Sequence, residues 1–335
     1  MTSDPAARLP AWAAEFGTAA EVAGDDVHAG LSLAERYGRL LPQPGEGATA
    51  QRWAVLALAG ERDLSVARIL EAHTDALAIL HEAGESDPAG SWGVFAAEAA
   101  DARLDADEHA PTVRLSGTKP WCSLAGSLDH ALVTAHVGEN RRLYAVDLRQ
   151  ESVTVEPPRH WIARGLAHIT SAPVHFTATP ATPVGEPGWY LRRSGFAWGG
   201  MGVAACWYGG ALGLLASLHR ASAKRDGDLP ALHVGTVDAM LHGAAATLAQ
   251  AASAVDTGAA GGADGERLAL RVRAVVADAV ERTIRQVGHA LGPAPLAFDE
   301  RHARRVADLE LYVRQHHAER DLAALGRSVL SGRRG

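Results

Sequence analysis

The stretch LSGTKPWCSLAGSLDHALVTA, residues 115–135, decides the fold, because it passes from one extended segment through turn residues into another. The hundred or so residues around it show the same pattern: short runs between turn residues, without helical periodicity. The runs are WGVFAAEA (92–99), TVRLSG (112–117), HALVTAHV (130–137), RLYAVDL (142–148), SVTVEP (152–157) and APVHFTA (172–178). Strands without intervening helices predict an antiparallel barrel or sandwich.

The sequence on both sides of this region is typical of helices. Before it, apolar residues recur at three- and four-residue steps, and Asp63 is placed to cap a helix that ends near Gly84. After it, long apolar-periodic segments with short connections predict an antiparallel bundle. Their ranges are 190–224, 232–256, 266–291 and 303–326.

We therefore predict an α+β chain in three parts. An N-terminal helical domain covers residues 1–88, a central antiparallel β-barrel covers 89–187, and a C-terminal four-helix bundle covers 188–335. The apolar, Gly- and Ala-rich segment 199–218 is nearly long enough to cross a bilayer, but small residues suit a tightly packed bundle better. We expect it to be a core helix and predict no membrane association.

The composition excludes several classes of protein. The net charge is −7 and arginines are dispersed, so nothing predicts nucleic-acid binding. The two cysteines, Cys122 and Cys206, are too few for a disulfide framework. The N-terminal residues lack the apolar core of a secretion signal, so we expect a cytoplasmic protein.

Residues 115–135 resemble a motif of the acyl-CoA dehydrogenase family, in which Leu-x-Gly-x-Lys precedes Trp-x-Ser/Thr and a strand of small apolar residues. In that family the Trp packs against the isoalloxazine ring of FAD, and the hydroxyl lies near flavin N5. The resemblance assigns these cofactor-binding roles to Trp121 and Ser123. They are suitable residue types, since a flat heteroaromatic ring needs a flat apolar wall and N5 needs a hydrogen-bond partner.

Three further segments resemble the same family in the expected order. Ala96, Ala97 and Glu98 occupy the place of a strand end whose backbone holds the flavin pyrimidine edge. Residues 165–188 are similar to the exit from the barrel. Gln286 and Gly292 match a loop that reaches the FAD adenylate of a neighbouring subunit. The resemblance thus implies bound FAD and a homodimer or homotetramer.

The family's catalytic carboxylate has no counterpart where the resemblance places it. Acyl-CoA dehydrogenation needs a carboxylate that removes the α-proton as hydride passes to N5. The two expected places hold Val313 and Arg314, or Arg192 and Arg193. The nearest catalytic candidates downstream are His316, His317 and Glu319. These three residues could also ligate a metal, but they are too close in sequence to predict a metal site.

Three functions remain open at this point. The resemblance implies an oxidoreductase that acts on an acyl-CoA or a related acyl substrate. A flavin-dependent monooxygenase on the same scaffold is the alternative, in which an imidazole of His316 or His317 acts near neutral pH. The third is a catalytically silent subunit that keeps the fold.

The segment RILEAHTDALAIL, residues 68–80, carries an unusual set of polar residues. Glu71 and Asp75 are like charges four residues apart, opposite the apolar stripe, so we expect them on a solvated face. His73 lies inside the stripe, four residues from Ile69 and from Leu77. We expect a hydrogen-bonded core histidine there, with a polar lining of a substrate cavity as the alternative.

Overall fold

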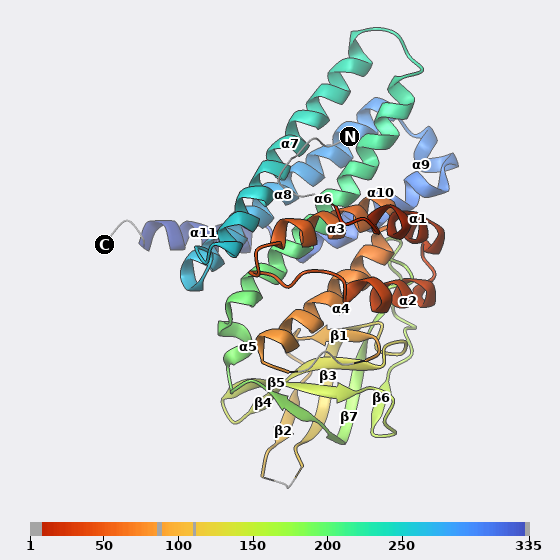
Figure 1. Ribbon diagram of the computed structural model, residues 1–335. Helices are drawn as coiled ribbons and strands as arrows, with labels where there is room; N and C mark the ends of the chain where they lie inside the picture. Colours follow the sequence, from red (N-terminus) through yellow and green to blue (C-terminus); the bar gives the residue numbers. More distant parts are fainter. Residues whose placement is uncertain (1–8, 86–88, 110–111, 332–335) are drawn as a thin grey trace.

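The computed structural model describes residues 9–85, 89–109 and 112–331. Helices lie at both ends of the chain and a single sheet lies between them, with the sheet below the helices in Figure 1. The predicted α+β outline is therefore confirmed. The predicted boundary after residue 88 falls at residues 86–88, which lie outside the described part of the chain.

The N-terminal helices are α1 (Ala13–Ala23), α2 (Val27–Gly38), α3 (Thr49–Arg62) and α4 (Leu64–Glu82). Asp63 caps α4 as predicted, since its carboxylate accepts hydrogen bonds from the backbone N–H groups of Ser65 and Val66. Helix α4 contacts α2, α3, α6 and α10, and it also packs on the first strand of the sheet. It is thus covered by protein on several sides.

The sheet has eight strands. They are β1 (Trp92–Phe95), β2 (Leu104–Asp107), β3 (Arg114–Ser123), β4 (His130–Val137), β5 (Asn140–Asp147), β6 (Val153–Val155), β7 (Ser171–Pro180) and β8 (Thr182–Val184). Their order is β6-β7-β3-β2-β4-β5-β8, with β1 added on β4. Pairing is mostly antiparallel, although β1 and β2 both pair with β4 in parallel. Within the described residues no pairing joins β6 to β8, so the expected barrel is observed as an open, curved sheet.

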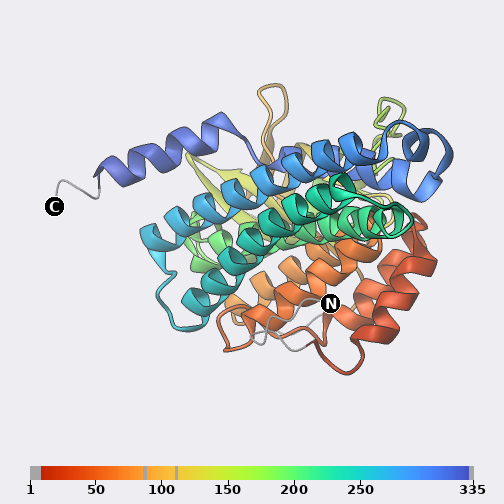
Figure 2. The ribbon, with the colours of Figure 1, turned by 90° about the horizontal axis from the view of Figure 1, so that it is seen from above.

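The C-terminal part begins with α5 (Trp189–Arg192) and continues with three long helices side by side (Figures 1 and 2): α6 (Ser194–Ser222), α7 (Asp228–Asp256) and α8 (Gly262–Leu291). The apolar segment 199–218 lies within α6 and is a core helix, as predicted. In its most apolar window, 83% of the residues are buried inside the protein.

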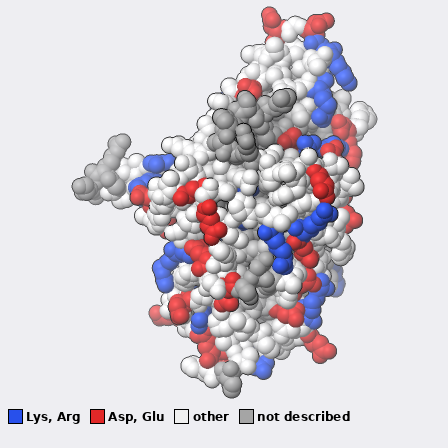
Figure 3. All heavy atoms as spheres, in the orientation of Figure 1, with Lys and Arg blue, Asp and Glu red and all other residues white. Residues whose placement is uncertain are grey.

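The fourth bundle helix, expected over 303–326, is interrupted. After α9 (Ala294–Phe298), helix α10 (Glu300–Tyr312) ends in a short 3-10 turn (Val313–Gln315), and α11 (Glu319–Ser331) follows. Ala318, just before α11, has a left-handed φ of 44°. The chain direction therefore changes here, and both ribbon views show α11 extending away from the body of the molecule. On the face drawn in Figure 3, acidic and basic side chains are interspersed.

Candidate functional site

Trp121 stands on an irregular part of β3. The register between β3 and β7 shifts between Lys119 and Cys122, and Trp121 within this bulge has a φ of 58°. A left-handed backbone costs a bulky residue on the order of 1–3 kcal/mol, and such strain concentrates at functional sites. The bulge turns the indole outward, leaving Trp121 62% exposed. A large apolar ring is thus presented to the outside by a strained backbone.

Ser123 lies two residues further along β3 and faces the helices. Its hydroxyl is 2.7 Å from the hydroxyl of Ser171, and Arg68 of α4 donates to it at 3.5 Å. The structure therefore brings Trp121 and Ser123 to the end of β3 that faces α4. Their contact with a flavin stays a prediction.

A buried ion pair supports the segment that follows β1. Lys119 is almost fully buried, and its Nζ donates to Glu98 at 2.6 Å and to Thr134 at 2.8 Å. Partial burial alone would raise the pKa of Glu98, but Lys119, with help from His136 and Arg141, outweighs it, so the pKa lies below its usual value. Ala96 and Ala97 immediately precede Glu98, so this ion pair fixes the backbone expected to hold the flavin. The sequence motif contained Lys119 but did not reveal this partner.

Glu71 and Asp75 are not on a solvated face, and that prediction was wrong. The Glu71 side chain is 11% exposed and that of Asp75 is 25% exposed. Their side of α4 is covered by α6 and α10, which sequence periodicity within α4 cannot show. Glu71 accepts from Arg68 at 2.9 Å and from the Tyr312 hydroxyl at 3.2 Å. Burial raises the pKa of both carboxyls despite neighbouring arginines.

His73 is the hydrogen-bonded core histidine that we expected. It is fully buried, and the backbone N–H of Trp92 donates to its Nδ1 at 3.2 Å. Burial, with help from Arg39 and Arg52, lowers its pKa to about 4. His73 is therefore neutral near pH 7 and joins α4 to β1.

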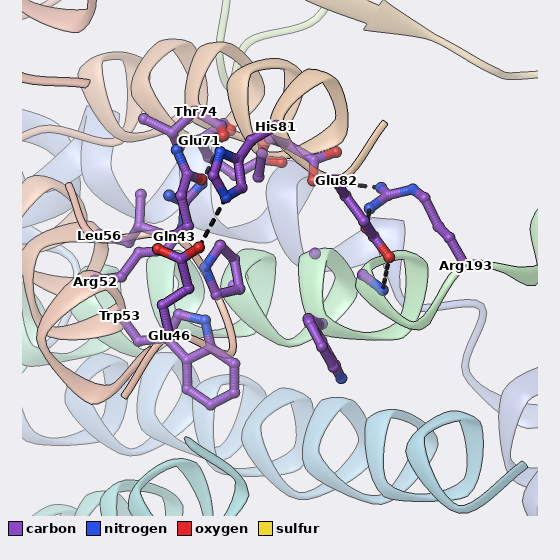
Figure 4. A pocket seen from close by; sticks show the side chains of 17 residues that line it. Gln43, Glu46, Arg52, Trp53, Leu56, Glu71, Thr74, His81, Glu82 and Arg193 are labelled. Carbon is purple, nitrogen blue, oxygen red and sulfur yellow. Dashed lines mark hydrogen bonds and ion pairs between the residues drawn. The ribbon is translucent and has the colours of Figure 1, made fainter. Parts of the chain in front are cut away.

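A cavity of about 260 Å³ lies between α3, α4, the start of α6 and the loop before α3 (Figure 4). Its wall combines four carboxylates with two guanidinium groups and two indoles: Glu46, Glu71, Asp75, Glu82, Arg52, Arg193, Trp53 and Trp198. Gly195 and Gly199 of α6 leave room for the charged groups. A Cβ at position 199 would lie 2.7 Å from Asp75 Oδ1.

His316, His317 and Glu319 lie where α10 gives way to α11. His316 Nδ1 and His317 Nδ1 are 3.2 and 3.3 Å from the two oxygens of Asp321, and the His317 backbone N–H also donates to that carboxylate. Burial lowers the pKa of His316. The structure thus brings the two histidines together at the start of α11. Their predicted catalytic role stays untested, and none of the three lines the cavity described above.

Gln286 and Gly292 are at the end of α8, far from the sheet in Figure 1. Gln286 Nε2 is 2.7 Å from His233 Nδ1, and Gly292 ends the helix with a φ of 68°. Within one chain they do not meet Trp121. Their predicted contact with the FAD of a neighbouring subunit remains a prediction.

We compared the sequence and the fold with those of known proteins. No family model matches the sequence, and no curated protein matches it. The butyryl-CoA dehydrogenase of Megasphaera elsdenii superposes with a TM-score of 0.78 at 15% identity, over 96% of this chain and 99% of that one. The protein has the acyl-CoA dehydrogenase fold.

Other structures with the acyl-CoA dehydrogenase fold are similar to the same extent. KijD3, in complex with FMN and an amino-keto dTDP-sugar, has a TM-score of 0.80 at 16% identity, over 99% of this chain and 95% of that one. The dibenzothiophene monooxygenase TdsC from Paenibacillus sp. A11-2 has 0.76 at 18% identity, over 96% of both chains. In this chain, α4 contacts Ser123 of β3 through Arg68 and also lines the charged cavity.

Proposed function

We propose that the protein is a flavin-dependent oxidoreductase whose flavin ring lies against Trp121. The observation that carries this proposal is the exposed indole on a strained bulge, with the Ser123 hydroxyl two residues away. Structures of the same fold support it. KijD3 binds FMN, and PigA, which superposes on this chain with a TM-score of 0.79 at 13% identity over 100% of both chains, binds FAD. We propose FAD as the cofactor, held also by the backbone at Ala96 and Ala97 and by Gln286 and Gly292 of a second copy.

The residues present fit a flavin. Trp121 offers a flat apolar surface and Ser123 offers a hydroxyl. The ion pair of Lys119 with Glu98 holds the backbone at Ala96 and Ala97 in place. A bound flavin would supply hydride transfer at N5. Arg68 lies between Ser123 and Glu71, at 3.5 and 2.9 Å, so it connects this face to the cavity side of α4.

Two reactions follow from this arrangement, and a different observation favours each. For an acyl substrate, abstraction of the α-proton requires a carboxylate, and Glu71 is the one joined to Ser123 through Arg68. Monooxygenation is favoured by the absence of a carboxylate at positions 313 and 314, where Val313 is buried and Arg314 pairs with Glu281. In a monooxygenase, the imidazole of His316 would take the place of the missing carboxylate. We propose that either reaction takes place in the cytoplasm, in a homodimer or homotetramer.

The decisive experiment is the absorption spectrum of the purified protein, with mass analysis of the released ligand. We expect flavin bands and FAD. Bleaching by an acyl-CoA panel would identify a dehydrogenase, whereas substrate-dependent oxygen uptake with a flavin reductase would identify a monooxygenase. Protein that carries no flavin and binds none when FAD or FMN is added would refute the proposal.

Replacing Trp121 by Gly separates binding from folding. The change removes an exposed ring and relieves the left-handed strain, which more than offsets the flexibility of glycine in the unfolded chain. We expect the flavin-free variant to be about 1 kcal/mol more stable to denaturant than flavin-free wild type, while flavin affinity falls at least about tenfold. Phe298→Gly, at a residue that is 90% exposed on α9, is the control and should leave flavin affinity unchanged.

A further inference from the structure

We propose that the cavity between α3, α4 and α6 binds a positively charged group of the substrate, an amine or a guanidinium, and that Asp75 is its partner. This inference rests on the proposed function only in calling the ligand the substrate. The cavity, its charges and its volume belong to the structure whether or not a flavin is bound.

The charges on the cavity wall favour a cation. Four carboxylates face two guanidinium groups. Glu46 is bound to His81 at 2.8 Å and Glu82 to Arg193 at 2.7 Å, as Figure 4 shows. Even with Arg68 counted behind Glu71, negative groups outnumber guanidinium groups by one. A ligand with one positive charge would offset this excess of one carboxylate in the cavity wall.

Asp75 is the carboxylate that lacks a close partner. Among the described residues its nearest cation is Arg193, whose Nη2 is 3.9 Å from Oδ1, and no hydrogen bond reaches it. The guanidinium of Arg52 is bound instead to backbone oxygens, at 3.1 Å to Pro42 and 2.6 Å to Thr74. A carboxylate three-quarters buried without donors is costly, and N–H groups of a bound cation would relieve that cost.

A second acceptor in the same wall is also unpaired. Gln43 Oε1 is buried and has no hydrogen-bond partner in the described part of the chain. Two acceptors without donors call for a ligand that donates, and an ammonium or guanidinium group does so with several N–H bonds. The indoles of Trp53 and Trp198 line the cavity too and suit both an apolar skeleton and a cation.

The volume limits the ligand. About 260 Å³ admits a molecule of roughly one ring and not a long, flexible chain. The predicted ligand is therefore a small apolar skeleton that carries one amine or guanidinium group.

The test compares three probes of nearly equal shape and different charge: benzylamine, benzyl alcohol and benzoate. We expect calorimetric titration of the purified protein at pH 7 to show benzylamine binding at least about tenfold more tightly than benzyl alcohol, the worth of one charge-assisted hydrogen bond. Benzoate should bind most weakly. The buried Nε of Arg193 is the unpaired donor that an anion would use, so preferential binding of benzoate would overturn the proposal.

Two variants assign the effect to Asp75. Asp75→Asn keeps the shape and removes the charge, so the preference for benzylamine should disappear while benzyl alcohol binds as before. Glu82→Gln leaves Asp75 intact but removes the partner of Arg193, whose guanidinium then turns to Asp75. Benzylamine affinity should fall severalfold. A benzylamine preference that survives in Asp75→Asn would overturn the assignment.

Controls separate this inference from the proposed function. Asp278→Asn changes a carboxylate on α8 that is 67% exposed and pairs with Arg282, and it should leave all three affinities unchanged. Flavin content is measured in every preparation. Amine binding by a protein that carries no flavin and binds neither added FAD nor added FMN would refute the redox function and keep the cavity assignment. A flavin-loaded protein that does not discriminate among the probes would do the reverse.

Discussion

Glu98 and Asp75 are both partly buried carboxylates beside cationic side chains, yet their surroundings differ. Glu98 accepts from Lys119 at 2.6 Å and has His136 and Arg141 within 3.5 Å. In the described part of the chain, Asp75 has one cationic group within 4 Å, that of Arg193 at 3.9 Å. The pKa of Glu98 is lowered, because Lys119, His136 and Arg141 together outweigh burial, whereas burial dominates and raises the pKa of Asp75. Glu98 holds the structure together, and Asp75 is available to a ligand.

The difference shows what separates a structural carboxylate from a functional one. Both residues are acidic, and both approach cationic side chains only in the folded chain, so residue type alone does not distinguish them. What distinguishes them is whether the fold supplies donors at hydrogen-bond distance. Four predictions test this distinction, in order of decreasing effect.

Glu98→Gln should be the most damaging of these changes. It leaves the ammonium of Lys119, almost fully buried, without its anion. Breaking a buried pair costs 3–5 kcal/mol, and because Glu98 is 34% exposed we expect about 2 kcal/mol in denaturant titrations. Lys119→Met combined with Glu98→Gln should regain most of this loss. A single variant as stable as wild type would show that Lys119 finds water or another partner.

Asp308 tests the effect of burial on a carboxylate that has a backbone donor. Leu166 donates to it at 2.5 Å, but burial raises its pKa to about 6. The folded state then holds the proton more tightly than the unfolded state, so stability falls as pH rises from about 4 to about 6. Asp308→Asn should remove a loss of roughly 2 kcal/mol between pH 4 and pH 7, measured as the difference in unfolding free energy. An unchanged pH dependence would contradict this assignment.

Asp75→Asn should hardly change stability in the absence of a ligand. Among residues 9–85, 89–109 and 112–331, Asp75 makes one long ion pair, and the uncharged amide avoids the cost of burying a charge. We expect a change below about 1 kcal/mol at pH 7, in either direction, by the same denaturant titration. A loss as large as that of Glu98→Gln would mean that Asp75 is a structural residue, and the comparison would fail.

Glu46→Gln should have the smallest effect. Glu46 and His81 form a 2.8 Å pair at the cavity rim, but both side chains are more than half exposed. Exposed pairs contribute at most a few tenths of a kcal/mol, so the thermal midpoint should stay nearly constant. A clear drop in the midpoint would show that this pair holds the loop before α3 in place.

The sequence was sufficient for the outline because local signals agree with the fold. The Asp63 cap, the strand runs around residues 115–135 and the apolar segment of α6 each specify their own element. It was insufficient where an outcome depends on distant chain segments. Closure of the sheet depends on β6 meeting β8, and the break after α10 depends on Ala318 and on contacts of Asp321 with the two histidines.

The candidate site divides in the same way. Trp121 and Ser123 could be proposed together because they lie two residues apart in one motif, and their contact with a flavin stays a prediction. Glu71 and Asp75 were misplaced because their burial comes from α6 and α10, more than a hundred residues away in sequence. A signal was present, since Gly195 and Gly199 near the start of α6 leave space beside charged groups. Reading it required knowing that α6 lies against α4.

Helix α4 contributes to both surfaces at once: Arg68 reaches Ser123 on one side, and Asp75 faces the cavity on the other. The backbone N–H of Trp92 in β1 donates to His73, and this hydrogen bond restricts rotation of α4 relative to the sheet. A substitution on the cavity side of α4 therefore changes the cavity wall while Arg68 keeps its contact with Ser123.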